Sequence, residues 1–310
     1  MKRDAVGAAA RGRKRWGWGM LVAGAFLSGL ALVGTALFWP KGEDRPVPAA
    51  SSFAPPTLLP SAGPVDNPLS PSRGPRIAIV IDDLGYDPVR DAEWLDFPGK
   101  ITASVIPFGP SSRTFAASAR SRGHGVILHV PMEPESPAED RTGPFRLRRG
   151  MRPEEMEEAF SRMAHDVPQA NGASNHMGSA FTSDAGAMAA FAAVLKGKGF
   201  FFVDSLTTAS SVGLEAAGRA GVPALRRDVF LDDDPRPGEM RRQWEKALAI
   251  AKERGEAVLV CHSRRETRKA LLELLPDLLK EGILPVTVEE LLAARETPSR
   301  SGGHSFPPPR

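Results

Sequence analysis

The chain has 310 residues, 42% hydrophobic and 25% charged, which fits one globular domain of about 200–250 residues with extensions. Its one cysteine, and its 30 glycines and 29 prolines without a short period, exclude a collagen-like, coiled-coil or disulfide-rich protein. The net charge of +3 includes +5 from residues 1–15 and +2 from residues 297–310, so residues 76–296 carry −4. An acidic folded part disfavours nucleic acid as a partner, because that function requires a basic face on the domain.

Residues 16–39 are expected to form a transmembrane anchor. Residues 19–39 run for 21 positions without a charge, and at about 1.5 Å per residue they span a hydrocarbon core of roughly 30 Å. Trp16, Trp18 and Trp39 mark the two ends, and six basic residues precede the run. We therefore expect a single-pass protein of the cell inner membrane, with residues 1–15 in the cytoplasm and the rest periplasmic. A cleaved signal peptide is the alternative, since it combines the same features.

Two further segments are expected to be disordered. Residues 40–75 form a Pro/Ser/Ala-rich linker that holds ten of the 29 prolines, and they contain too little apolar surface to offset chain entropy. Residues 297–310 form a proline-rich tail. The folded domain is therefore expected at 76–296, and its single Cys261 allows no disulfide within the chain.

Short apolar runs alternate with helical patterns along residues 76–296. Strands are expected at 77–81, 101–106, 125–129, 200–203, 224–231, 257–261 and 283–286, with a weaker one at 173–176. Helices are expected at 153–165, 184–196, 238–254 and 267–280. Continuous runs of Val, Ile and Phe indicate strands buried on both faces, and the alternation indicates parallel β/α units. The pattern favours a closed or nearly closed (β/α) barrel, with an open doubly wound sheet as the alternative.

Polar residues follow several of these apolar runs, where parallel β/α folds place their ligand sites. Asp82 and Asp83 come directly after the first run. Adjacent carboxylates point to opposite faces of a regular strand, so both reach one site only if the strand ends or bends. One Asp would then bind a metal and the other would act as a base. The alternative is that Asp83 caps the following helix.

Three histidines stand at comparable positions. His129 follows an apolar run and precedes Glu133 by four residues, and His176 follows Asn175 in the sequence NHMGS. Two histidines and a carboxylate suit zinc or a similar divalent metal, with open positions for water and substrate. His262 follows the run at 257–261 and suits a general acid. The alternative for each histidine is a hydrogen-bonded residue of a turn or strand end.

The remaining candidates have orienting roles. Asp204 follows the run at 200–203, where it could orient the base or a histidine, and Ser205 lacks the Gly-x-Ser-x-Gly turn of a nucleophilic serine. Asn175 is placed to orient a substrate amide or hydroxyl. No phosphate-binding Gly-rich loop follows any predicted strand.

Together these motifs resemble the divergent polysaccharide deacetylase family, a distant branch of the NodB-like carbohydrate esterases. The resemblance rests on IAIVIDDLGYD, ITASVIPFGPSS, HVPMEP, NHMGSAFTSD, FFVDSLTT and RDVFLDD, in order across roughly residues 76–293. It implies a distorted (β/α) barrel with Asp82 as base, Asp83 and His129 as metal ligands, and His262 as acid. Glu133 stands where the wider superfamily has a second histidine ligand, and His176 offers a substitute.

The first hypothesis is therefore a membrane-anchored, periplasm-facing metal-dependent hydrolase that deacetylates an acetylated polysaccharide or cell-wall glycan. A catalytically inactive glycan- or protein-binding envelope module that retains the barrel is the alternative. A metal-dependent hydrolase of another substrate, such as a phosphoester, is a third hypothesis.

Overall fold

The computed structural model describes residues 74–136, 140 and 142–296 of the chain. The basic segment at 1–15, the expected anchor at 16–39, nearly all of the expected linker and the expected tail at 297–310 therefore lie outside the described residues. Within the described ranges, no helix combines the length and the apolar character needed to cross a membrane.

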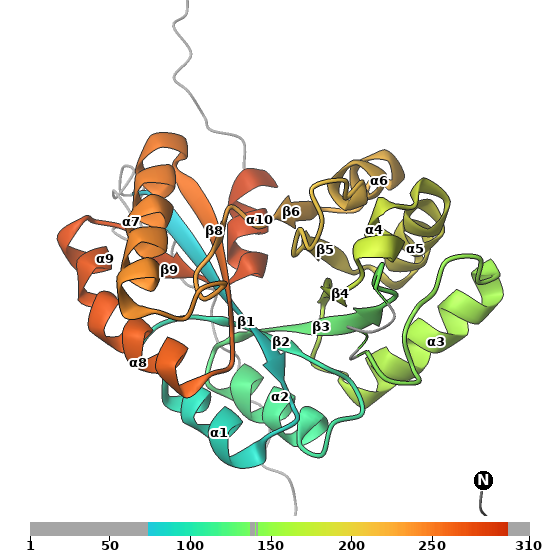
Figure 1. Ribbon diagram of the computed structural model, residues 1–310, viewed down its shortest axis with the longest axis horizontal. Helices are drawn as coiled ribbons and strands as arrows, with labels where there is room; N and C mark the ends of the chain where they lie inside the picture. The colour runs from blue at the N-terminus through green and yellow to red at the C-terminus, as the bar shows by residue number, and fades with distance from the viewer. Residues whose placement is uncertain (1–73, 137–139, 141, 297–310) are drawn as a thin grey trace, which may run out of the picture. The chain divides into compact units, whose positions relative to one another are not determined.

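The described part alternates strands and helices along almost its whole length (Figure 1). The strands are β1 (Arg76–Leu84), β2 (Thr102–Val105), β3 (Gly125–Met132), β4 (Gly172–Met177), β5 (Phe201–Asp204), β6 (Ala224–Arg226), β7 (Val229–Phe230), β8 (Glu256–His262) and β9 (Leu284–Val286). The helices are α1 (Pro88–Ala92), α2 (Ser112–Ser121), α3 (Pro153–Asp166), α4 (Ser179–Ser183), α5 (Ala185–Lys198), α6 (Gly213–Ala220), α7 (Pro237–Arg254), α8 (Arg265–Leu274), α9 (Pro276–Lys280) and α10 (Val288–Glu296), with a 3-10 helix η1 (Glu93–Asp96).

All pairings between these strands are parallel, in the order β6-β5-β4-β3-β2-β1-β8-β7. From β1 to β6 each strand pairs with the next one in the chain, and β1 also pairs with β8. This cyclic order is that of a barrel, whereas a doubly wound sheet reverses its strand order at a switch point. β9 pairs with the first residues of β1, before the part of β1 that pairs with β2.

The predicted strand at 224–231 is divided in two. β6 pairs with β5 and β7 pairs with β8, and only Arg227 and Asp228 lie between them. The chain bends there because the Arg227 amide donates to the carbonyl of Asp204, while the Asp228 amide donates to the carbonyl of Val258. This two-residue bend joins the two edges of the sheet. The parallel α/β architecture is therefore confirmed, in the form of an incomplete barrel consistent with the NodB-like type.

The predicted helix at 267–280 is also divided. α8 ends at Leu274 and α9 begins at Pro276. Proline has no amide hydrogen to donate to the preceding turn, so the hydrogen-bond ladder is interrupted at this position.

Alternate residues of the strands face two apolar layers. Ile77, Ile79 and Ile81 of β1 belong to the larger cluster, which includes side chains from the surrounding helices. Ala78 and Val80 belong to a smaller inner cluster with residues of β3, β5, β6, β8 and α10. Burial on both faces explains why the strands read as continuous apolar runs in the sequence. We call the face that carries the smaller cluster the inner face.

Candidate metal centre

Polar side chains continue the inner face at the carboxyl ends of three strands. Since side chains alternate along a strand, the residue two positions after an inward apolar residue also points inward. Asp82 of β1 follows Ala78 and Val80 in this way, His129 of β3 follows Ile127, and His262 of β8 follows Val258 and Val260. The apolar interior therefore ends in one carboxylate and two imidazoles.

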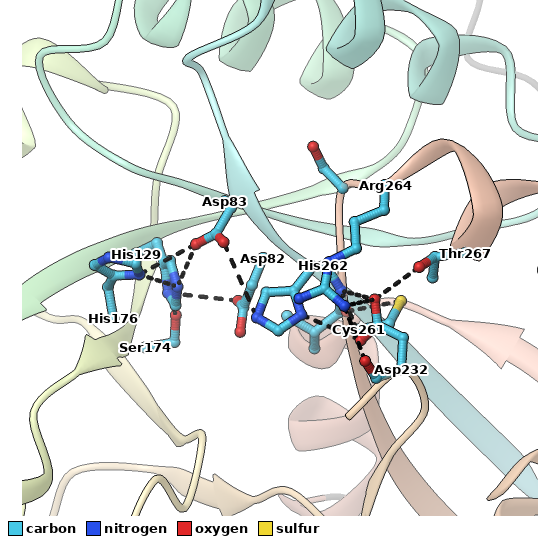
Figure 2. Close-up of polar contacts among 12 residues, drawn as sticks. Asp82, Asp83, His129, Ser174, His176, Asp232, Cys261, His262, Arg264 and Thr267 are labelled. Carbon is cyan, nitrogen blue, oxygen red and sulfur yellow. Dashed lines mark hydrogen bonds and ion pairs between the residues drawn. The ribbon is translucent and has the colours of Figure 1, made fainter. Parts of the chain in front are cut away.

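Asp83 joins this group because the end of β1 is irregular. Its φ angle is 65°, in the left-handed region, and the register between β1 and β2 shifts between Ile81 and Leu84. Because the strand bends here, the adjacent carboxylates of Asp82 and Asp83 can both reach one site. Figure 2 shows Asp83 between the pair His129 and His176 on one side and His262 on the other.

Three potential ligand atoms lie within a few ångströms of one another. The Nε2 atom of His129 is 3.4 Å from Oδ1 of Asp83, and the Nδ1 atom of His176 is 3.1 Å from the same oxygen. The two nitrogens are 3.2 Å apart. Among the described residues, Asp83, His129 and His176 form a group of side chains that could hold a metal ion.

These separations fit a divalent metal ion. Ligand atoms at roughly 2.0–2.1 Å from a tetrahedral zinc ion lie about 3.3 Å from one another. The Oδ1 atom of Asp83 is buried and has no well-formed hydrogen bond from any described residue, although both imidazoles are close. A buried acceptor without a donor is costly, and a cation at the centre of the three atoms would satisfy it. Two imidazoles and one carboxylate are also a donor set typical of catalytic zinc sites.

A second layer of polar groups holds the ring of His129. Its Nδ1 atom lies 2.8 Å from the hydroxyl of Ser174, which lies 2.8 Å from the hydroxyl of Ser104. The Oδ1 atom of Asp82 lies 3.4 Å from the same nitrogen and has no hydrogen-bond partner among the described residues. A proton on Nδ1 would leave the lone pair of Nε2 directed toward Asp83 and His176, as metal ligation requires.

Electrostatics favour the ionised form of Asp83. Burial alone would raise the pKa of this carboxyl, but the polar contacts and charge interactions with His129 and His176 hold it far below its usual range. The carboxylate is therefore ready to ligate a cation without first losing a proton.

His262 forms a separate pair with Asp232, on the other side of Asp83. Its Nδ1 atom is 3.2 Å from Oδ1 of Asp232, and its backbone amide donates to the same carboxylate. Thr267 also donates to this carboxylate, at 2.7 Å. The Nε2 atom of His262 faces the site, 4.0 Å from Oδ2 of Asp83.

The two members of this pair shift each other's pKa. Burial opposes protonation of His262, but the hydrogen bond with Asp232 and the charge of that carboxylate raise the pKa of the imidazole above its ordinary value. Burial likewise opposes ionisation of Asp232, yet the contacts with His262 lower the pKa of this carboxyl. A histidine held in this way stays protonated at a higher pH than usual, as a general acid requires.

A pocket of about 290 Å³ opens beside these groups. Its lining includes Asp82, His129, His176, His262, Arg227 and Phe230. His129 and His176, two of the three candidate ligands, therefore share this pocket with the buried carboxylate of Asp82 and with His262.

Residues 79–292 match the divergent polysaccharide deacetylase family, and this match covers more than half of the chain. The chain belongs to this family. The resemblance inferred from the sequence motifs is thereby confirmed.

Two bacterial relatives and one solved structure are similar to this divergent polysaccharide deacetylase. The Escherichia coli K12 protein YibQ is 34% identical over 211 residues, which cover 67% of this chain and 65% of YibQ. A Haemophilus influenzae Rd protein is 35% identical over 192 residues, which cover 62% of this chain and 68% of the relative. The match thus spans just under two thirds of YibQ. The crystal structure of ATU2773 from Agrobacterium tumefaciens C58 superimposes with a TM-score of 0.69 at 25% identity, covering 72% of this chain and 92% of that one.

The structure brings together five of the residues singled out in the sequence, and the other three make different contacts. Asp82, Asp83, His129, His176 and His262 meet at the site. Glu133 pairs with Arg149 at 3.0 Å and is not part of the ligand cluster. Asn175 lines the pocket, where its side chain accepts from the Ser205 amide and donates to the Met177 carbonyl.

Asp204 has no hydrogen bond or ion pair with a histidine among the described residues. Its carboxylate accepts from the Leu206 amide at 2.8 Å and from the hydroxyl of Ser211 at 2.7 Å, so it shapes the loop after β5. The carboxylate that holds His262 is Asp232, a residue at a predicted strand end to which no role was assigned from the sequence. Its position in the motif RDVFLDD, directly after an apolar run, is the sequence feature that could have identified it as a site residue.

Proposed function

We propose that this divergent polysaccharide deacetylase is a zinc-dependent hydrolase that removes acetyl groups from an acetylated glycan. The convergence of one carboxylate oxygen and two imidazole nitrogens within 3.1–3.4 Å carries this proposal. Asp83, His129 and His176 would hold the ion. When bound, a zinc ion supplies Lewis-acid polarisation of a carbonyl oxygen and lowers the pKa of water.

Asp82 is the general base in this proposal. It lines the pocket, its side chain is buried, and its Oδ1 atom accepts no hydrogen bond from the described residues. A carboxylate with a free acceptor atom beside the ligands can take the proton from the water that attacks the acetyl carbonyl. Its position 3.4 Å from Nδ1 of His129 keeps it in contact with the imidazole.

His262 is the general acid. Its Nε2 atom faces the site, and Asp232 holds the proton on Nδ1 and stabilises the imidazolium form. The Nε2–H group would protonate the amine or alcohol that leaves when the acetyl group is cleaved. A carboxylate that can accept a proton and a histidine that can donate one lie on separate strands, and this pair supports an acyl-transfer reaction with a poor leaving group.

The proposed place of action rests on the sequence alone. The uncharged run at 19–39 and its basic flank favour an inner-membrane anchor with the barrel in the periplasm, where the substrate would be a cell-wall or other envelope glycan. Fractionation of cells, with protease digestion of spheroplasts, tests this part: only a periplasmic domain is digested while the membrane is intact.

Acetate release from the full-length protein tests the reaction. The protein is stripped of metal with a chelator, reloaded with zinc, and supplied with N-acetylglucosamine oligomers and with an O-acetylated glycan. We expect acetate from at least one of these in the zinc-loaded protein only. Asp83→Asn and His129→Ala should lose both bound zinc and activity, whereas the exposed His165→Ala should retain both.

A folded protein that binds zinc and glycan but releases no acetate would contradict the proposal. That outcome would favour the alternative of a non-catalytic glycan-binding module. The presence of Glu133 in place of a second histidine was one ground for that alternative, and in the proposed site the Nδ1 atom of His176 would be the ligand instead of Glu133.

A further inference from the structure

Arg227 occupies an unusual place in the barrel. It is one of the two residues of the bend that joins β6 to β7, and its side chain lines the pocket together with Phe230 and His262. The proposed chemistry at Asp82 and His262 does not require a guanidinium group at this position.

The guanidinium group is held in one orientation. Its Nε atom donates to the carbonyl of Ser205 at 2.7 Å, and its Nη2 atom donates to the carbonyl of Leu206 at 2.9 Å. Its central carbon lies 4.7 Å from the centroid of the Phe230 ring. Leu206 has a φ angle of 50°, a costly conformation for a residue with a branched side chain, and this turn presents the two carbonyls.

This arrangement leaves the other edge of the guanidinium free. The two backbone carbonyls occupy the edge formed by Nε and Nη2, and Nη1 has no hydrogen-bond partner among the described residues. The remaining edge, formed by Nη1 and Nη2, is the fork that binds two oxygens side by side. The side chain is thus fixed by one edge and available through the other.

Within the described part of the chain, Arg227 also has no direct ion pair. No described carboxylate forms an ion pair with it, in contrast to Arg264, which lies 3.6 Å from Asp232. A half-buried cation without a direct ion pair costs free energy, and an anionic ligand that contacts it would offset part of that cost.

We propose that Arg227 binds a carboxylate of the substrate, so that the preferred substrate is an acetylated glycan carrying an acidic sugar. This inference rests on the proposed function and names its substrate class. Asp233, Asp82 and Asp204 are close enough to interact electrostatically with Arg227. A singly charged carboxylate is repelled less by these groups than a doubly charged phosphate, and it fills the two-oxygen fork.

The test compares two ligands of nearly the same shape, one anionic and one neutral. The disaccharide of N-acetylglucosamine and N-acetylmuramic acid is used with its lactyl carboxylate free or converted to the amide, and affinity is measured by calorimetry with full-length protein. We expect the free acid to bind at least about tenfold more tightly than the amide. Arg227→Gln should bring this ratio close to one, and Arg227→Lys should keep only part of it. The control Arg226→Gln, at the exposed neighbouring residue, should leave the ratio unchanged.

A ratio is insensitive to the fraction of folded protein, so a destabilised variant still gives an answer. A ratio near one in the unaltered protein, or a ratio that persists in Arg227→Gln, would overturn the inference. Tighter binding of N-acetylglucosamine 1-phosphate than of the free acid would overturn the preference for carboxylate. Arg227-dependent binding of an acetylated oligomer of uronic acid would support the inference, and the recognised carboxylate would then be the one on the sugar ring.

The two proposals can fail separately. Acetate release that is equal from acidic and neutral glycans, and equally affected in Arg227→Gln, would sink the substrate class and leave the deacetylase proposal standing. An Arg227-dependent ratio in a protein that releases no acetate would support the acidic ligand class and contradict the deacetylase proposal.

Discussion

The hydroxyl of Ser174 lies 2.8 Å from Nδ1 of His129, the ring nitrogen that faces away from Asp83 and His176. Ser104 lies 2.8 Å beyond it, so hydroxyls from β2 and β4 support an imidazole from the strand between them. Hydrogen bonds of this kind fix the ring orientation and the tautomer of a metal-binding histidine. The strength of metal binding should therefore depend on residues that do not touch the ion.

Ser174→Ala tests this dependence. The substitution removes the hydroxyl and leaves every proposed ligand in place, so we expect zinc affinity to fall by about tenfold or somewhat more. Competition with a chromogenic chelator measures the change. Ser112→Ala is the matched control, because Ser112 is also a buried serine with two hydrogen bonds, but it is the first residue of α2 and contacts no proposed ligand. Equal zinc affinity in the two variants would show that Ser174 does not orient the ligand.

The pair of Asp232 and His262 predicts a specific pH dependence. A general acid must be protonated, so activity should be present below the pKa of His262 and be lost as the pH rises through it. Because Asp232 raises this pKa, Asp232→Asn should move the alkaline limb of the pH profile to lower pH. His262→Ala should reduce kcat by about 10²–10⁴-fold, and Asp232→Asn by less, since the imidazole remains.

Asp228→Asn is the control for this substitution. Asp228 and Asp232 both accept a backbone amide of β8, from Val258 and His262 respectively, but only Asp232 contacts an imidazole. The control should lose stability without moving the alkaline limb. Titration of the His262 ring by NMR gives the same information independently of turnover. An unchanged His262 pKa in Asp232→Asn would contradict the assignment.

Much of the site can be read from strand periodicity. Asp82, His129 and His262 each end a buried apolar run, and alternation alone places them on the inner face with Val80, Ile127 and Val260. Parallel strands bring such residues to one edge of the sheet. The approximate positions of the strands and the parallel α/β class follow from the same pattern.

Features set by backbone irregularities were not predictable in this way. The participation of Asp83 depends on its left-handed φ angle and on the register shift in β1, which no local pattern specifies. The division of 224–231 at Arg227 depends on which edge each half meets, a property of the closing sheet. Asp232 stands first in a run of three aspartates, and only the tertiary contact with His262 distinguishes it from Asp233 and Asp234.

β4 is a strand that its sequence predicts only weakly. Its sequence, GASNHM, has few large apolar residues, so propensity makes it a weak strand, yet it pairs with both β3 and β5. Pairing on both sides outweighs local preference, as is common for strands in the middle of a sheet. The second proposed histidine ligand, His176, comes from this strand, and the chain turns sharply at Gly178 directly after it.

Gly178→Ala should destabilise the protein more than an ordinary glycine substitution does. Gly178 has a φ angle of 84°, and a Cβ atom there would lie 2.7 Å from the Cβ of Met132 on the neighbouring strand. The Met132 Cβ is attached directly to the backbone, so no side-chain rotation relieves the contact. Backbone strain and overpacking together should lower the free energy of unfolding by about 2–4 kcal/mol.

Gly199→Ala separates the two causes. Gly199 has a φ angle of 71°, but a Cβ atom there would meet no atom of the described residues within 4 Å, so only the strain applies. The loss of stability should then be about 1–2 kcal/mol. Urea unfolding of both variants without metal measures the difference. Because Gly178 follows His176 by two residues, zinc affinity should also fall in Gly178→Ala and stay constant in Gly199→Ala. Equal losses of stability, with equal zinc affinity, would mean that the turn after β4 yields without disturbing the ligand.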